Sequence, residues 1–458
     1  MVFSSIIFLF RFLPITLFVY YIAPKKLKNT VLVVCSLFFY SWGEVKYFPI
    51  MIASVLVDYI VSLVIEKNRG KKGICRLCMG ISLFFNLGML FFFKYTNFFV
   101  ENINALTGIH LTGIQLTLPL GISFYTFQTL SYTIDVYRGK TTAERNIMNF
   151  AAFVTLFPQL IAGPIVKYTD ISRELRDRKI HLAQINEGIA LFIFGLGKKV
   201  LIANNIGSLW NQVQDLGFAN VSTPLAWLGI LAYSFQIYFD FSGYSLMAIG
   251  MGKMLGFEFP QNFNYPYISK SMTEFWRRWH MTLGSWFREY VYIPLGGNRV
   301  SKPRMYLNIF IVWAATGFWH GASWNFVLWG LFFFVFLVIE KAFLLKSLEK
   351  SKVFSHLYVC FFLLLSWTLF AITDFSQLGL FLQKLFSFTG GNDWTYYLRN
   401  YFITFLAAIL CSIPLVEKLY NKIKGIPVVN LLILAVIFIV SVAYLVDATY
   451  NPFLYFRF

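Results

Sequence analysis

Runs of apolar residues about 20 positions long, the length that crosses a bilayer as a helix, alternate with short polar segments that carry most of the charge. They predict membrane helices over residues 3–22, 30–43, 47–65, 76–94, 117–137, 184–206, 223–249, 306–319, 322–343, 354–373, 399–416 and 428–449. We therefore expect an all-α, polytopic membrane protein with about 10–12 transmembrane helices, joined by short loops.

One apolar stretch differs from the others. Residues 146–166, "NIMNFAAFVTLFPQLIAGPIV", have basic blocks on both flanks and contain Pro158, Gly163 and Pro164. The basic flanks place both ends of this stretch on one side of the membrane, and helix breakers lie inside it. Together these features indicate a re-entrant segment. Irregular backbone is tolerated at membrane depth only where protein or a water-filled cavity satisfies it. This segment is the first indication of an internal chamber or tunnel.

Residues 253–305 do not form a span either, because basic side chains recur among aromatic ones. Such a pattern is typical of helices that lie at the cytoplasmic interface. Ser271, with Glu274 three residues later, fits a capping box and predicts a helix start. Glu274 and Arg278 are four residues apart and can pair along that helix.

Basic residues also come in alternating blocks, which predicts the orientation. One block surrounds residues 25–28, another 67–72, and a third extends from 138 to 179, whereas 95–137 and 200–252 carry neither arginine nor lysine. By the positive-inside rule the basic loops are cytoplasmic and the N-terminus lies outside. The outside-facing segments are then loops of roughly 95–117, 207–222 and 374–398, all short and weakly charged.

Composition agrees with this picture and narrows the function classes. The chain is 58% hydrophobic and 13% charged, too little charge to cover a water-facing surface. No polar block is long enough to fold alone, so we expect a single integral membrane domain over residues 1–458. The net charge of +18 is assigned to cytoplasmic loops instead of a nucleic-acid surface. Cys75-x-x-Cys78 is half a zinc motif without a second half, and no metal site is expected.

Among five histidines, His110, His181 and His356 fall in or beside polar loops, where a solvated ring is the ordinary interpretation. His320 lies at the junction of two apolar runs. An ionisable residue at membrane depth is a functional-site hypothesis, and the alternative is a neutral ring bonded to a backbone carbonyl between helices. Gly317 and Gly321 flank it, so another backbone or a ligand can approach closely.

Two further polar residues are candidates. His280 follows two arginines and is either a functional group or another interfacial side chain. Asp240 is a carboxylate inside a predicted span, near Gln236, Ser242 and Tyr244, where it either lines a polar path or makes structural hydrogen bonds.

No phosphate-binding glycine loop, Ser-His-Asp order or metal-ligand cluster can be identified. The remaining candidates for chemistry are a histidine base between apolar runs, the basic and aromatic segment 253–305, and the broken segment 146–166. A neutral imidazole suits proton transfer near neutral pH, so group transfer is favoured.

The motifs that carry these residues are specific. "YFDFSGYS", "FWRRWHMTLGSWFREYVYIPLGGNR" and "TGFWHGASWNFVLWG", with "LPLGISFYTFQTLSYTIDVYRG" and "FPQLIAGPIV", resemble the membrane-bound O-acyltransferase family. They are most similar to its bacterial branch related to alginate O-acetyltransferases. The resemblance extends from the N-terminus to about residue 345; the remaining residues match only as apolar spans.

The resemblance implies catalytic roles for His320 and His280, on helices over 306–343 and on the interfacial segment 253–305 respectively. It implies a tunnel past His320 along which an acyl group, acetyl above all, passes from a cytoplasmic thioester such as acetyl-CoA to the outside. No bound cofactor is implied. Candidate substrate-binding residues are Arg277, Arg278, Arg288, Arg299, Asp240, Trp319 and Asn325. The four arginines either form the approach for a phosphate-bearing donor or attract anionic lipid. One departure is Leu246, where relatives usually have aspartate.

The expected function is O-acetylation of an extracytoplasmic polysaccharide or cell-wall polymer by a multi-pass protein of a bacterial cytoplasmic membrane. Because no outside segment can fold into a sugar-binding domain, we expect an exported, hydrolase-like partner to complete the transfer. D-alanyl transfer to teichoic acid is a close alternative. A transporter or flippase is a second class, although it should show paired broken segments in two repeated halves, and only one such set is present.

Overall fold

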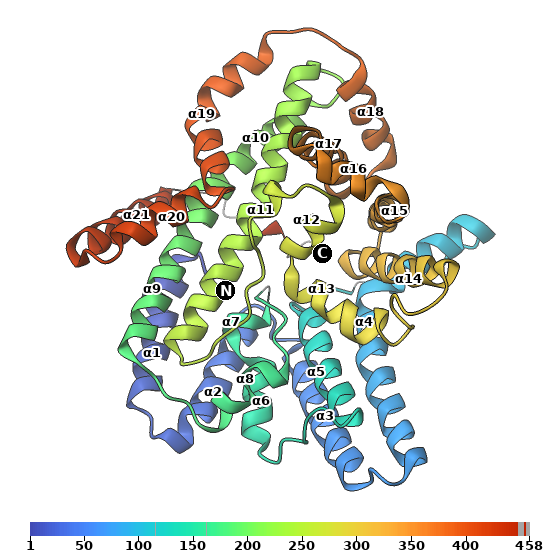
Figure 1. The fold of residues 1–458 in the computed structure, drawn as a ribbon. Coiled ribbons are helices and arrows are strands. Elements are labelled where there is room, and N and C mark those ends of the chain that lie inside the picture. The colour runs from blue at the N-terminus through green and yellow to red at the C-terminus, as the bar shows by residue number, and fades with distance from the viewer. Residues whose placement is uncertain (115, 162, 448–452, 455–458) are drawn as a thin grey trace. The chain divides into compact units, whose positions relative to one another are not determined.

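The computed structural model describes residues 1–114, 116–161, 163–447 and 453–454 (Figure 1). All regular secondary structure within these ranges is helical, which confirms the all-α prediction. The chain divides into two compact units. Unit 1 comprises Met1–Phe192 and Ser245–Pro260, and unit 2 comprises Ile193–Tyr244 and Gln261–Phe458.

Unit 1 contains the N-terminal helices. In chain order they are η1 (Phe8–Phe12), α1 (Leu13–Ile22), η2 (Lys25–Leu27), α2 (Lys28–Ser41), α3 (Phe48–Lys67), α4 (Lys72–Thr107), α5 (Ile122–Tyr137), α6 (Ile147–Thr155), α7 (Phe157–Leu160), α8 (Tyr168–Arg176) and most of α9 (Leu182–Gly197).

Helices α3, α4 and α5 pack side by side in unit 1 around a buried carboxylate (Figure 1). Asp58 of α3 is fully buried and accepts hydrogen bonds from Ser82, from Asn86 Nδ2 at 2.7 Å and from Thr133 Oγ1 at 3.0 Å. A buried carboxylate is costly unless its oxygens are bonded, so these contacts select this arrangement of the three helices.

The segment predicted to be re-entrant is broken, as its prolines and glycine require. Helix α6 ends at Thr155, and α7 begins at Phe157 with Pro158 in its first turn. Protein groups satisfy the backbone at the break: Phe157 N donates to Ser36 Oγ at 3.0 Å, and Gln159 Nε2 donates to Phe153 O at 2.5 Å. Its position in a membrane stays a prediction.

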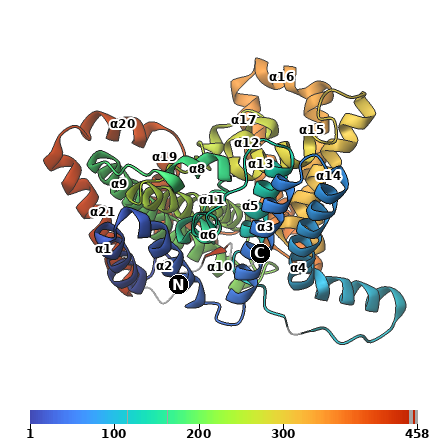
Figure 2. The ribbon, with the colours of Figure 1, turned by 90° about the horizontal axis from the view of Figure 1, so that it is seen from below.

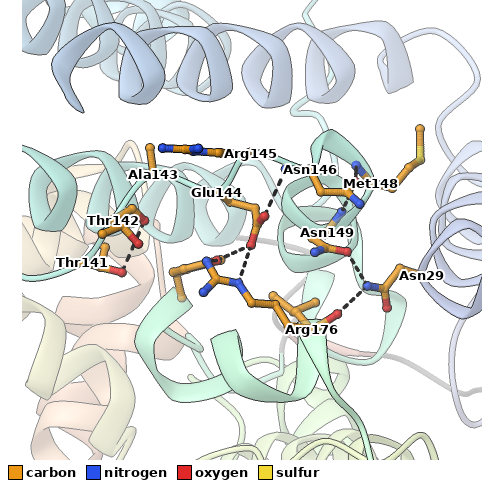
Figure 3. Close-up of polar contacts among 12 residues, drawn as sticks. Asn29, Thr141, Thr142, Ala143, Glu144, Arg145, Asn146, Met148, Asn149 and Arg176 are labelled. Carbon is orange, nitrogen blue, oxygen red and sulfur yellow. Dashed lines mark hydrogen bonds and ion pairs between the residues drawn. The ribbon is translucent and has the colours of Figure 1, made fainter. Parts of the chain in front are cut away.

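A polar cluster joins α8 to the loop between α5 and α6 (Figure 3). Glu144 of that loop accepts from Tyr168 Oη at 2.6 Å, from Arg176 Nε at 3.1 Å and from the Asn146 backbone N at 3.0 Å. Burial acts to raise the pKa of Glu144, but these hydrogen bonds outweigh it and leave the pKa below its ordinary value. The carboxylate is therefore charged near neutral pH and holds α8 in place.

The end of α4 and the loop after it protrude from the helix bundle as an arm, in which the loop turns back along α4 (Figure 2). Two asparagines seven residues apart on α4 bind the backbone of the loop that follows the helix. Asn97 exchanges two hydrogen bonds with Ile114, and Asn104 exchanges two with Leu111. The side-chain amides thus replace the backbone partners that this irregular segment lacks.

Unit 2 contains the remaining helices. They are η3 (Lys198–Asn204), α10 (Asn205–Leu216), most of α11 (Thr223–Met254), η4 (Pro266–Ile268), α12 (Met272–Arg278), α13 (Met281–Phe287), η5 (Arg288–Tyr292), α14 (Lys302–His320), α15 (Trp324–Ile339), η6 (Glu340–Leu344), α16 (Leu345–Lys350), α17 (Lys352–Ala371), α18 (Phe375–Phe386), α19 (Asp393–Cys411), α20 (Leu415–Ile423) and α21 (Pro427–Asp447).

Every predicted span coincides with helix in the described residues, although boundaries and lengths differ. In the part of the chain that the structure describes, six helices are long and apolar enough to cross a membrane, or seven if α19 and α20, bent by 76°, count as one span. The others are shorter, interrupted or richer in polar residues. The broad class, a polytopic helical membrane protein, is confirmed.

All three predicted outside loops are wrong in detail. In the loop predicted over 95–117, helix α4 continues to Thr107. The helix expected to end at 206 continues through α10 to Leu216 and stops at Gly217, whose φ of +77° a side chain rarely tolerates. Residues 375–386 form α18 instead of loop. Asp374 caps it by accepting from Gln377 N at 2.8 Å, and Leu378, Phe381 and Leu385 bury one face.

Candidate active site

The site is built on the crossing of α14 and α15, where glycines allow the two backbones to touch. A Cβ at Gly317 would lie 2.5 Å from Phe326 O, and one at Gly330 would lie 2.5 Å from Trp313 O. The close approach predicted for the glycines near His320 is therefore made by another helix. This crossing fixes the end of α14 against the start of α15.

His320 is the last residue of α14 and is 3% exposed. Its ring lies edge-on to three aromatic rings, with centroids 5.0 Å from Trp319, 4.9 Å from Trp329 and 5.4 Å from Phe370. Aromatic rings on these three sides exclude water from the imidazole.

His280 joins α12 to α13 and is 1% exposed. Its φ of +44° lies in the left-handed region, which is uncommon for a residue with a side chain. Burial holds the pKa of His280 well below its usual range. Strained backbone of this kind concentrates at functional sites.

Trp319 brings the two histidines into one cluster. Its ring centroid lies 6.0 Å from His280 and 5.0 Å from His320. Two histidines that are 40 positions apart in the sequence thus flank one indole. Of the residues proposed from sequence, these three are adjacent.

Beside this cluster unit 2 contains a cavity of about 570 Å³. This volume falls in the range of small-molecule sites. The inner lining includes buried Trp313 and His280, whereas the basic residues Arg277, Arg288 and Lys341 are exposed. The cavity is therefore apolar and aromatic inside, with positive charge at its exposed edge.

Much of that edge comes from π-helical turns, which are frequent at functional sites. Arg288 and Tyr292 belong to η5, and Lys341 belongs to η6. Asn298 joins the two turns because its Oδ1 accepts from Tyr292 Oη at 2.6 Å and from Lys341 Nζ at 2.7 Å.

Aromatic rings connect the cavity to His320. Trp276 lines the cavity, and its centroid lies 5.6 Å from that of Trp329. Trp329 in turn lies 4.9 Å from His320. His280 lines the cavity directly, whereas His320 lies behind this aromatic layer.

Helix α12, which carries Arg277, is held by a residue of η6. Glu340 is 1% exposed and accepts from Met272 N at 2.6 Å, Thr273 N at 2.9 Å and Thr273 Oγ1 at 2.7 Å. A carboxylate bound to the free N–H groups at a helix start stabilises that helix. Glu340 therefore sets where α12 lies relative to Lys341.

The predicted local structure of this segment is largely confirmed. Ser271 Oγ accepts from Glu274 N at 3.0 Å, and Arg278 Nε donates to Glu274 Oε1 at 2.9 Å. The glutamate does not close a capping box on Ser271, however, because its Oε2 accepts from Lys270 N.

Five of the seven predicted substrate-binding residues do not line the cavity, namely Arg278, Arg299, Asp240, Trp319 and Asn325. Arg278 is paired with Glu274 and also donates to Asn264 O at 3.0 Å. Asn325 is fully buried and donates to Leu369 O at 3.2 Å, which joins α15 to α17. Arg299 is absent from the lining as well.

Asp240 of α11 forms a buried ion pair. Its Oδ1 lies 2.6 Å from Lys199 Nζ, and both side chains are at most 2% exposed. Lys199 also donates to Asn204 Oδ1 at 2.7 Å, while Asp240 Oδ2 accepts from Leu454 N at 2.8 Å. These contacts support the structural-hydrogen-bond alternative for Asp240.

Comparison with known proteins identifies the family. Residues 142–347 match the membrane-bound O-acyltransferase family. A probable alginate O-acetylase of Azotobacter vinelandii is 40% identical over 402 residues, which cover 86% of this chain and 79% of the relative. A peptidoglycan O-acetyltransferase of Helicobacter pylori is 37% identical over 409 residues, covering 81% and 77%. A teichoic acid D-alanyltransferase of Streptococcus thermophilus is 32% identical over 260 residues, covering 53% and 61%.

By its likeness to these relatives the chain is a membrane acyltransferase, and it belongs to the membrane-bound O-acyltransferase family. Within that family it falls in the branch similar to alginate O-acetylases, and it is an O-acetyltransferase.

The Lys199–Asp240 pair generates a stability prediction. Asp240→Asn leaves the lysine charge buried without a counter-charge, and breaking such a pair costs about 3–5 kcal/mol. We expect a large drop in the thermal unfolding midpoint of the purified protein in detergent. The double variant Lys199→Met/Asp240→Leu removes both charges and should recover most of the loss. A double variant less stable than Asp240→Asn would contradict this account.

Proposed function

We propose that this protein transfers an acetyl group from a cytoplasmic thioester donor, such as acetyl-CoA, across the membrane for O-acetylation of an extracytoplasmic polymer. The observation that carries the proposal is the cavity, whose exposed edge is basic and whose inner wall reaches His280. Its charge suits a phosphate-bearing donor, because an arginine fork gives phosphate two parallel hydrogen bonds. The aromatic layer behind it leads to His320.

His320 acts in this proposal as the general base. Neutral imidazole takes the proton of the acceptor hydroxyl as its oxygen attacks the thioester carbonyl. The new C–O bond forms, the C–S bond breaks, and the proton passes from the imidazolium to the leaving thiolate. Trp319 and Trp329 hold the ring in place and exclude water, which would otherwise hydrolyse the thioester.

The polymer is reached through an exported partner. The predicted outside segments carry α10, α18 and the arm after α4, and none of these is large enough to form a sugar-binding domain. A hydrolase-like partner with a serine hydroxyl would accept the acetyl group and pass it to a polysaccharide or cell-wall polymer. D-alanyl transfer is the second candidate function, because a teichoic acid D-alanyltransferase is among the relatives. It would use the same site with a D-alanyl thioester as the donor.

His320→Ala is expected to insert and fold but to lose transfer. Removing a general base lowers a rate by about 10²–10⁴-fold. The measurement is the rate of labelled acetyl transfer from acetyl-CoA to acceptor. His356→Ala is the control, since that histidine is half-buried on α17 and does not line the cavity. A His320→Ala variant within threefold of wild type would remove His320 from the mechanism.

Arg277→Gln and Arg288→Gln, alone or together, are expected to raise the Michaelis constant for the donor with little change in kcat. Loss of one hydrogen bond to a charged group corresponds to roughly a tenfold change. Arg304→Gln is the matched control, because Arg304 is exposed on α14 and lies away from the cavity. If Arg277→Gln, Arg288→Gln and Arg304→Gln all change only the binding of anionic lipid vesicles, the basic edge of the cavity binds the membrane surface and not the donor.

The two-component scheme is tested by reconstitution. Vesicles receive the protein with acetyl-CoA on the face predicted to be cytoplasmic and polymer on the other. We expect polymer acetylation only after the exported partner is added. Efficient acetylation by this chain alone would refute the partner's role, and transfer from D-alanyl carrier protein in preference to acetyl-CoA would establish the second candidate.

A further inference from the structure

Asn262 is a buried residue that no part of the proposed reaction uses. It is 1% exposed, and its Oδ1 accepts three hydrogen bonds. The donors are Thr282 Oγ1 at 2.9 Å, Thr282 N at 3.3 Å and the ring Nδ1 of His280 at 3.1 Å. One oxygen thus connects the histidine at the cavity to the first turn of α13.

These contacts determine which ring nitrogen of His280 carries the proton. A backbone N–H can only donate, so the amide atom that faces Thr282 N is the oxygen. An amide oxygen can only accept, and Nδ1 must therefore carry a hydrogen. In a neutral imidazole the lone pair is then on Nε2.

The surroundings keep the ring neutral. Burial disfavours its charged form, and the basic residues that line the same cavity, Arg277, Arg288 and Lys341, act in the same direction. Carboxylates of the packed elements are already engaged: Asp240 by Lys199, Glu274 by Arg278, and Glu340 by the start of α12.

The main chain supports the same contact. Met281 N donates to Asn262 O at 2.9 Å, and Asn264 N donates to Arg278 O at 2.9 Å. Residues 262–264 therefore run beside the junction of α12 and α13 and bind it on both sides of His280. A left-handed residue with a side chain costs about 1–3 kcal/mol and persists only where its surroundings enforce it.

We propose that Asn262 is a positioning residue that fixes the Nδ1-protonated tautomer of His280, so that Nε2 offers a lone pair to an N–H or O–H of the donor. The identity of that donor rests on the proposed function, whereas the tautomer does not. An amide N–H of a pantetheine arm is the class of group that such an acceptor binds. Asn262 acts only through His280 and does not touch the substrate.

The direct test is nitrogen NMR of histidine-labelled protein in lipid, with the His280 signals identified by their loss in His280→Gln. We expect a protonated Nδ1 and an unprotonated Nε2. Asn262→Leu should shift the ring toward the other tautomer. Thr282→Val is the matched control, because it removes one bond to the same Oδ1 and leaves the His280 contact intact. A wild-type ring protonated on Nε2, or an unchanged tautomer in Asn262→Leu, would overturn the proposal.

The kinetic test uses Asn262→Asp, which keeps an oxygen acceptor but adds a negative charge. That charge stabilises the imidazolium and raises the pKa of His280. Activity requires the neutral ring, so the acid limb of the pH–rate profile should move to higher pH. Asn262→Leu should instead raise the Michaelis constant for acetyl-CoA about tenfold without moving that limb.

The two arms separate failure of the inference from failure of the proposed function. An unmoved acid limb in Asn262→Asp, with normal acetyl-CoA turnover, would contradict the role of Asn262. If the protein does not use acetyl-CoA at all, the proposed function fails, and the NMR measurement still decides the tautomer.

Discussion

The constraint on which this structure depends is that a polar group inside an apolar surrounding must find its partner within the protein. Asp58 is held by side chains of two other helices, Asp240 by Lys199, and the break at Leu156 by Ser36 and Gln159. Hydrophobic contact between lipid-facing helices is non-directional, so it does not choose among packings. Directional polar contacts make that choice, because an unsatisfied buried group is expensive.

The same constraint shapes the active site. The cavity edge needs charged side chains, and its inner wall needs neutral ones, only a few residues apart on α12 and α13. Glu340 and Asn262 resolve this conflict from outside those helices, one by binding the start of α12 and the other by binding the turn at His280. The histidines can then lie among aromatic rings while arginines a few positions away reach solvent. Rigid placement of this kind is what a transfer reaction requires.

Local features of the site could be predicted from sequence. The Ser271 cap and the Glu274–Arg278 pair involve residues three and four positions apart, and helical periodicity brings such residues together. The contacts that complete the site join residues far apart: His280 and Asn262 are 18 positions apart, and Glu340 and Met272 are 68 apart. Periodicity contains no information on such pairs. Lys199 and Glu340 were not proposed as site residues although each lies inside a predicted span, because the buried partner of each is distant in the sequence.

The π turn at Glu340–Leu344 has a consequence for how this protein tolerates insertions and deletions. A π turn accommodates one residue more than an α-helix of the same course. Glu340 therefore faces inward to α12 while its neighbour Lys341 reaches the cavity edge, and Leu348 further on still returns to the buried core. Deleting one residue here would leave the composition almost unchanged, yet it would rotate the following helix by about 100°. Chain length in this turn is therefore as much a determinant of the site as the residues themselves.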